Sequence, residues 1–160
     1  MCREDVPVEN CDPFEACRAD IESGGHSVAA IVGDETGCDW AYSIGLTRSY
    51  AHPELVVVGL EAPFAGAVIE VLSRRVAEGE QLIPGSTVEV EGGLEFRLHL
   101  VDPLWCSRGD WFVLGREVMA TWGERWPTSI QLTWPDANGA FPEEPGDPRW
   151  SFRQPMLFNK

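Results

Sequence analysis

Apolar residues recur at helical spacing in three segments of the chain. Asp12 and Pro13 supply a cap and a first-turn proline for the first of these segments, and Gly24 follows its end. In all three segments large apolar side chains repeat every three or four residues, which is the pattern of an amphipathic helix. The predicted helices cover residues 13–23, the stretch between Pro63 and Gly79, and residues 111–122.

Other apolar stretches alternate with polar residues or are short and continuous, and these predict strands. The predicted strands cover residues 26–32, 39–46, 55–60, 87–91, 94–101 and 129–134. Residues 55–60 form an uninterrupted, mostly β-branched run, so this strand is expected at the centre of the sheet. Gly92-Gly93 indicates a tight hairpin between two of the strands.

Proline and glycine interrupt the chain after the last strand. Residues 135–148 are therefore expected to form an ordered but irregular wrap, with Phe141, Trp150 and Phe152 as its anchors. Strands in hairpins with helices between them favour an α+β fold over a doubly wound one. The sequence thus predicts a single domain over residues 1–160, built on a mainly antiparallel sheet of about six strands with three helices and an irregular C-terminal wrap.

The charge of the chain excludes several classes of partner. The formal net charge is -14, and Lys160 is the only lysine. Such a surface opposes binding to nucleic acid and to anionic membranes, and no apolar run has the length of about 20 residues that spans a bilayer. The N-terminus lacks the charged and then apolar plan of a secretory signal, so a cytoplasmic location is expected.

The cysteines suggest reduced thiols. Five cysteines at irregular spacings do not form a recognisable disulfide framework. Cys2, Cys11 and Cys17, with His26 nearby, lack the paired spacing of structural zinc sites, so no metal site is expected. The chain also contains seven tryptophans, and some of them are expected to line a groove or a subunit contact, unless they form a tryptophan-rich core.

The most suggestive polar motif is His52-Pro53-Glu54, where a loop enters the predicted central strand. A histidine followed two residues later by a carboxylate could act as a general base, so His52 and Glu54 are the candidate catalytic residues. The alternative is structural: His52 caps the loop, and Glu54 pairs with an arginine such as Arg48.

Further polar and aromatic residues near the predicted strand ends are candidates for ligand binding. They are Tyr42, Arg48, Gln131, Trp134 and Asp136. The residues from Asp136 to Gly139 resemble part of a calcium loop but lack its closing acidic residue, so an Asx-type turn is the better interpretation.

Several motifs in order along the chain resemble the bacterial domain of unknown function 4262 family. They are Tyr42-Ser43-Ile44-Gly45-Leu46, His52-Pro53-Glu54-Leu55, Gly59-Leu60, the run from Gln131 to Asp136 with Gly139, Phe141 and Pro142, and Gln154-Pro155-Met156-Leu157. The resemblance implies a shared fold and a bacterial origin, and it brings no established activity. The chain departs from the family pattern at Ser43, where threonine is expected, and in the wide separation of Cys2 and Cys11.

Two functions fit these observations. The first is a domain that binds or acts on a small polar molecule in a cleft formed at the strand ends by Tyr42, His52, Glu54 and the Trp134–Asp136 segment. The second is a non-enzymatic module that binds another protein, or a second copy of itself, through exposed aromatic side chains and an acidic surface. The sequence does not decide whether the protein is an enzyme, and it indicates no particular cofactor.

Overall fold

The chain folds around one sheet, and its elements follow the predicted order. The computed structural model describes residues 12–35, 37–145, 149 and 153–158. Within these residues the elements are α1 (Pro13–Glu22), β1 (Ser27–Ile31), β2 (Trp40–Ile44), α2 (Leu46–Tyr50), β3 (Glu54–Val58), α3 (Ala62–Ala77), β4 (Thr87–Val90), β5 (Leu94–Leu100), α4 (Pro103–Ser107), α5 (Val113–Ala120) and β6 (Ser129–Thr133). All the predicted strands and helices are present, with their ends shifted by a few residues.

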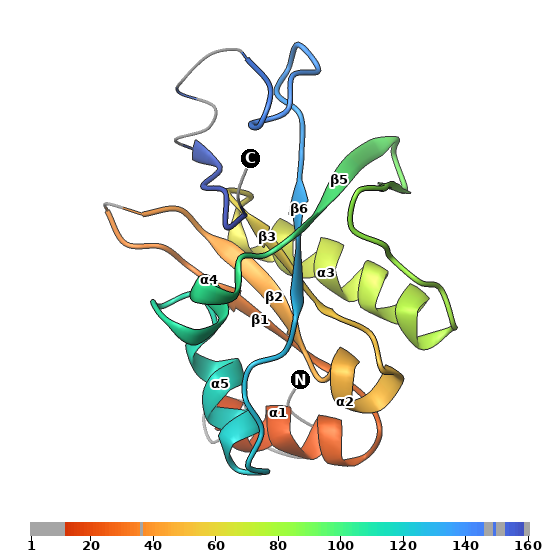
Figure 1. Cartoon of the computed structure of the whole chain (residues 1–160), viewed down its shortest axis with the longest axis vertical. Helices are drawn as coiled ribbons and strands as arrows, with labels where there is room; N and C mark the ends of the chain where they lie inside the picture. Colours follow the sequence, from red (N-terminus) through yellow and green to blue (C-terminus); the bar gives the residue numbers. More distant parts are fainter. Residues whose placement is uncertain (1–11, 36, 146–148, 150–152, 159–160) are drawn as a thin grey trace.

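The strands of this part of the chain form a mixed sheet in the order β1-β2-β3-β6-β5-β4. β3 and β6 run parallel, with Leu55 beside Ile130, and the other neighbouring pairs are antiparallel. The prediction of a mainly antiparallel α+β sheet of about six strands is confirmed. β3 lies at the centre beside β6, as its continuous apolar sequence predicts (Figure 1).

Helix α3 covers one face of the sheet. Its buried side chains recur at helical spacing, and the helix packs mainly on β2 and β1 and also on β3. The buried residues of α3 include Ala65, Ile69, Leu72 and Val76. Small side chains on the first two strands allow close packing here, since a Cβ added at Gly66 of α3 would lie 3.4 Å from the Ala30 Cβ.

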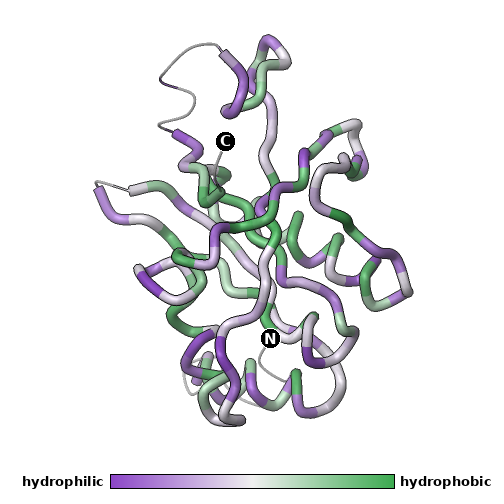
Figure 2. The backbone as a smooth tube through the Cα atoms, in the orientation of Figure 1, coloured by the Kyte–Doolittle hydropathy of each residue, from purple (hydrophilic) through white to green (hydrophobic). Residues whose placement is uncertain are grey.

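Helices α1 and α5 pack on the opposite face and enclose a second apolar cluster. This cluster joins Tyr42, Ile44, Val56 and Val58 from the strands to Cys17, Ile21, Phe112, Val118 and Trp126. Hydrophobic segments accordingly run through the central strands, while the outer loops are largely hydrophilic (Figure 2). The alternation along β2 and β3 therefore supplies both cores at once.

The structure adds two one-turn helices to the three that the sequence predicts. α2 and α4 each contain five residues, too few to show an amphipathic pattern. α5 begins at Val113 rather than Trp111. No helix in the described part of the chain is long and apolar enough to cross a membrane.

The C-terminal segment 153–158 lies against β6 and β5. Asp102 N donates a hydrogen bond to Leu157 O at 2.7 Å, and the Phe158 ring stacks on His99 with ring centroids 4.0 Å apart. Phe141 is buried, as predicted for an anchor of the wrap, whereas Trp150 and Phe152 lie outside the described residues. The segment therefore covers part of His99 on β5.

Candidate functional site

At the amino end of β3, the Glu54 carboxylate is fully buried and accepts three hydrogen bonds. Ser43 Oγ donates to Oε1 at 2.8 Å, Leu46 N donates to Oε1 at 3.1 Å, and Thr47 N donates to Oε2 at 3.0 Å. Leu46 and Thr47 begin α2, so the carboxylate satisfies backbone donors that the helix leaves without partners. Ser43 Oγ in turn accepts from Leu55 N at 2.9 Å, which joins β2 to β3 through one hydroxyl.

The pKa of Glu54 is well above that of an ordinary carboxyl group. Burial raises its pKa to about 7, while the hydrogen bonds from Thr47, Ser43 and Leu46 act in the opposite direction. Such a pKa is suited to general acid or base chemistry. All three donors nevertheless belong to the chain itself, so the geometry is that of a structural cap, and the catalytic role stays a prediction.

His52 is also buried and has internal partners on both ring nitrogens. Leu82 N donates to Nε2 at 2.9 Å, and Nδ1 lies 2.8 Å from Pro53 O. These contacts fit the tautomer that carries its proton on Nδ1, with Nε2 as the acceptor. Thr47 Oγ1 donates to His52 O at 2.8 Å and closes the loop between β2 and β3. His52 therefore fixes this loop, as the structural alternative proposed.

The arginine partner in that alternative is wrong. Arg48 Nη1 lies 2.7 Å from the Glu124 carboxylate, and the guanidinium carbon lies 4.2 Å from the centroid of the Trp122 ring. Arg48 thus pairs with Glu124 instead of Glu54, and it fastens α2 to the end of the α5 region.

Tyr42, the next predicted binding residue, packs entirely within the core. Its hydroxyl accepts a hydrogen bond from Gly115 N at 3.1 Å. Its ring meets those of Phe112 and Trp126 edge to face, with centroids 5.2 and 5.6 Å away. Burial raises the pKa of Tyr42 to about 12, so the hydroxyl stays protonated at neutral pH.

Gln131 and Trp134 hold the C-terminal segment and the end of β3. Gln131 Nε2 donates to Pro155 O at 2.7 Å, and its Oε1 accepts from Leu157 N at 2.6 Å. Trp134 Nε1 donates to Val58 O at 3.1 Å. These side chains therefore give hydrogen-bond partners to the backbone groups of Pro155, Leu157 and Val58, as a neighbouring strand would.

Asp136 forms the predicted Asx-type turn. Its Oδ1 accepts hydrogen bonds from Asn138 N at 2.8 Å and Ala140 N at 2.9 Å. The carboxylate therefore stabilises its own loop.

The structure does not bring the predicted site residues into one cleft. β3 and β6 are parallel, and Glu54 lies beside Ser129 at their amino ends. Trp134 contacts Val58 at the other end of β3. At about 3.3 Å per residue, these ends are roughly 13 Å apart. The predicted cleft shared by His52, Glu54 and the Trp134–Asp136 segment is thus not formed.

A cavity of about 960 Å³ opens instead at the carboxyl end of β3, and we call it the tryptophan cavity. Its walls come from the connection between β1 and β2, the start of β2, the residues after β3, the α4–α5 region and the C-terminal segment. Trp40, Trp105 and Trp111 line it, together with Glu35, Glu61 and Asp110. Its volume lies within the range of ligand-binding pockets.

Two of the three indole rings in the wall pack against each other. The Trp40 and Trp111 centroids are 5.0 Å apart at 70°, and Trp40 Nε1 donates to Trp111 O at 2.9 Å. Gly109, whose φ is +81°, lies close to both the Trp105 ring and the Trp111 ring. A Cβ added there would lie 3.8 Å from Trp111 Cδ1 and 3.9 Å from Trp105 Cε3. Trp105 nevertheless leaves 41% of its surface exposed.

Asp39, which lines the tryptophan cavity, holds two backbone segments together. Its two carboxylate oxygens accept from Gly33 N at 2.8 Å and from Ala62 N at 2.9 Å, which lower its pKa. Because Ala62 begins α3, Asp39 holds the β1–β2 connection against the start of that helix. The neighbouring side chains of Glu35, Glu61 and Asp110, by contrast, have no hydrogen bond or ion pair within the described residues.

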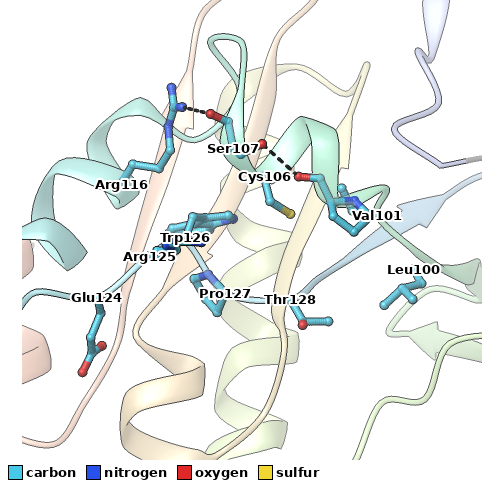
Figure 3. A pocket seen from close by; sticks show the side chains of 11 residues that line it. Leu100, Val101, Cys106, Ser107, Arg116, Glu124, Arg125, Trp126, Pro127 and Thr128 are labelled. Atoms are coloured by element: carbon cyan, nitrogen blue, oxygen red, sulfur yellow. Dashed lines mark hydrogen bonds between the residues drawn. The ribbon is translucent and has the colours of Figure 1, made fainter.

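A second cavity of about 630 Å³, which we call the Cys106 groove, lies between α4 and residues 124–128 (Figure 3). Burial raises the pKa of the Cys106 thiol, so the neutral thiol predominates at pH 7. Arg116 donates to Ser107 O at 3.0 Å and to Gly109 O at 2.6 Å. The Cys106 thiol is thus neutral, and the Arg116 guanidinium is already bonded to backbone carbonyls.

Cys17, Cys38 and Cys106 are free thiols, whereas Cys2 and Cys11 lie outside the described residues. Within the described ranges, no group of three or more histidine, cysteine, aspartate and glutamate side chains could hold a metal ion.

The sequence indicated the tryptophan cavity only through its composition. An abundance of tryptophan predicts an aromatic groove but does not say which rings meet. Trp40 and Trp111 lie 71 positions apart in the chain, and the paths of β2 and the α4–α5 region bring them together.

The fold and this cavity define a small α+β domain with helices on both faces of a mixed sheet and an aromatic cavity beside its central strand. The chain belongs to the family described as Domain of unknown function (DUF4262), which matches residues 20–148. The resemblance to this family is confirmed, and the matched range includes all three tryptophans of the cavity. No curated protein and no solved structure matches the chain.

Proposed function

We propose that this domain binds a small molecule in the tryptophan cavity. The observation that carries the proposal is a cavity of about 960 Å³ lined by three tryptophans and by Glu35, Glu61 and Asp110, whose carboxylates have no hydrogen bond or ion pair to the residues that the structure describes. Apolar walls with a few convergent polar groups are typical of ligand sites. These features support a ligand site at the carboxyl end of β3.

The exposure of Trp105 supports this proposal. A tryptophan side chain offers a large apolar surface, and 41% of this residue is open to solvent beside the other two rings. A ligand that covers this apolar surface removes it from water, and this burial favours binding.

The chemistry of the lining supports binding rather than covalent catalysis. Burial raises the pKa of the Cys38 thiol, which leaves it protonated at neutral pH. Asp39 has a lowered pKa, and both its oxygens accept backbone hydrogen bonds. Neither group is an activated nucleophile or a base with a free oxygen.

A fragment screen by ligand-observed NMR tests the proposal. The library contains cationic, neutral and anionic compounds in equal number, and it is applied to the full chain, Trp105→Ala and Leu104→Ala. Leu104 is the matched control, because it is exposed on the same helix, α4, but does not line the cavity. We expect hits that Trp105→Ala loses and Leu104→Ala keeps. An absence of hits, or hits that both variants retain, would contradict the proposal.

A second candidate function is protein binding through α3. Phe64 and Val71 lie seven residues apart on this helix and are 49% and 45% exposed, with the exposed Ala67 between them. Such an apolar stripe on the outer face of a helix is typical of a contact with another protein or a second copy. Sedimentation velocity of the wild type and Phe64→Ser tests self-association: a dimer that the variant loses favours this function, and a monomer at all concentrations removes the self-association form of it.

A further inference from the structure

We infer that the ligand of the tryptophan cavity is an organic cation with an alkylated ammonium group. This inference rests on the proposed function and adds the chemical class of the ligand. It is drawn from the combination of ring faces and negative charge in one cavity.

The aromatic part of the argument concerns the indole rings. An alkylated ammonium is attracted to the face of an aromatic ring, most strongly to tryptophan, and several rings around one cation form an aromatic cage. Trp40 and Trp111 meet at 70°, so their faces point in different directions. Trp105 adds a third ring across Gly109. Rings at different angles can contact a rounded cation from several sides at once.

The electrostatic part concerns the lining charges. Among the described residues, the cavity is lined by four acidic residues, Glu35, Asp39, Glu61 and Asp110, and by one basic residue, Arg153. The formal net charge of the whole chain is -14. The field in the cavity therefore attracts cations and opposes phosphate and carboxylate ligands.

The arrangement fits an organic cation better than a metal ion. A divalent metal needs several oxygen, nitrogen or sulfur ligands within about 2 to 2.6 Å, and no group of described side chains provides such a set. Indole rings offer no lone pair to a metal. Separated carboxylates instead supply a diffuse negative potential, and this suits a charge spread over methyl groups.

A matched pair of probes tests the inference. Choline and 3,3-dimethylbutan-1-ol have nearly the same shape, but only choline carries a charge. Both are titrated into the full chain by isothermal calorimetry and followed by tryptophan fluorescence. We expect choline to bind about tenfold more tightly than the alcohol. We also expect its affinity to fall between 50 and 500 mM NaCl, because salt screens the carboxylates.

Charge variants locate the effect. The double variant Glu61→Gln/Asp110→Asn is expected to weaken choline severalfold and to leave the alcohol unchanged. The double variant Glu78→Gln/Glu91→Gln is the control, because it also removes two negative charges, from exposed positions that do not line the cavity. Its affinity for choline should match that of the wild type.

The outcomes separate this inference from the proposed function. Equal or tighter binding of the alcohol, or binding of neutral sugar fragments in place of choline, overturns the cation class but preserves the cavity as a ligand site. Failure of choline together with failure of the whole fragment library overturns both.

Discussion

The two ends of β3 differ in how their polar groups are used. At the amino end, the Glu54 carboxylate and the His52 ring are buried, and all their hydrogen bonds go to groups of the same chain. At the carboxyl end, Glu61 and Asp110 border an open cavity, and Trp105 exposes 41% of its surface. The first arrangement stabilises the fold, whereas in the second the Glu61 and Asp110 carboxylates have no hydrogen bond or ion pair to the residues that the structure describes.

This difference shows why a polar motif is an ambiguous signal. A histidine and a glutamate two residues apart can form a catalytic pair, or they can hold a loop in place, and the sequence motif is the same in both cases. Only the donors around them distinguish the two, and those donors are backbone groups of α2 and Leu82 together with the Ser43 hydroxyl. A raised pKa does not separate the two roles, because burial alone produces it.

The largest expected effect follows removal of the Glu54 carboxylate. In Glu54→Ala, two backbone N–H groups and the Ser43 hydroxyl lose their acceptor, and we expect a loss of about 3 to 4 kcal/mol in the free energy of unfolding. Urea denaturation at pH 7 measures it. Glu124→Ala, which removes an exposed carboxylate paired with Arg48, should lose less than about 1 kcal/mol. A near-neutral Glu54→Ala would contradict the structural role.

The pH dependence of stability should carry the signature of Glu54. Its folded pKa is raised to about 7 from an ordinary value of 4.5, so the folded state binds this proton more tightly than the unfolded state. The stability contributed in this way is complete below about pH 4.5 and is lost as the pH rises through 7. Between pH 5 and 8 we expect the wild type to lose about 2 to 3 kcal/mol relative to Glu54→Gln. Parallel pH profiles for the two proteins would contradict the assignment.

A somewhat smaller loss is expected at His52. In His52→Ala the buried Leu82 N–H loses its acceptor, which should cost about 2 kcal/mol. Ligand binding should be unchanged once the variant is measured under conditions where it is folded. A variant with wild-type stability and abolished ligand binding would instead assign the amino end of β3 to function.

The smallest effect on stability is expected at the opposite end. Trp105→Ala truncates a half-exposed side chain on a one-turn helix, so we expect a change of less than about 1 kcal/mol, measured by thermal and urea unfolding. A loss above about 2 kcal/mol would show that this ring belongs to the core, and the comparison between the two ends of β3 would fail.

Most of the fold could be predicted, because its longer elements carry clear periodic patterns. The continuous run of β3 is buried on both faces of the sheet, and the apolar stripe on α3 packs into one of the two cores. The Gly92-Gly93 turn also forms, since both residues adopt positive φ. The one-turn helices α2 and α4 escaped detection because five residues do not define a face.

The candidate site could not be predicted in the same way. Parallel pairing of β3 with β6 is a long-range choice, and it separates Glu54 from Trp134. The same topology, together with the α4–α5 region, gathers Trp40, Trp105 and Trp111. The sequence shows that the tryptophans are present, but which of them line one cavity depends on contacts between distant segments of the chain.

The most direct test of the central claim uses the tryptophan side chains as reporters. Indole N–H resonances in a ¹H–¹⁵N correlation spectrum are assigned by single Trp→Phe substitutions, and the confirmed fragment hits are then added. We predict that the Trp40, Trp105 and Trp111 signals shift in a saturable manner. The Trp126 signal, whose Nε1 donates to Ser129 Oγ beside the Cys106 groove, should stay in place. Shifts confined to Trp126, or none at the three cavity tryptophans, would contradict the account.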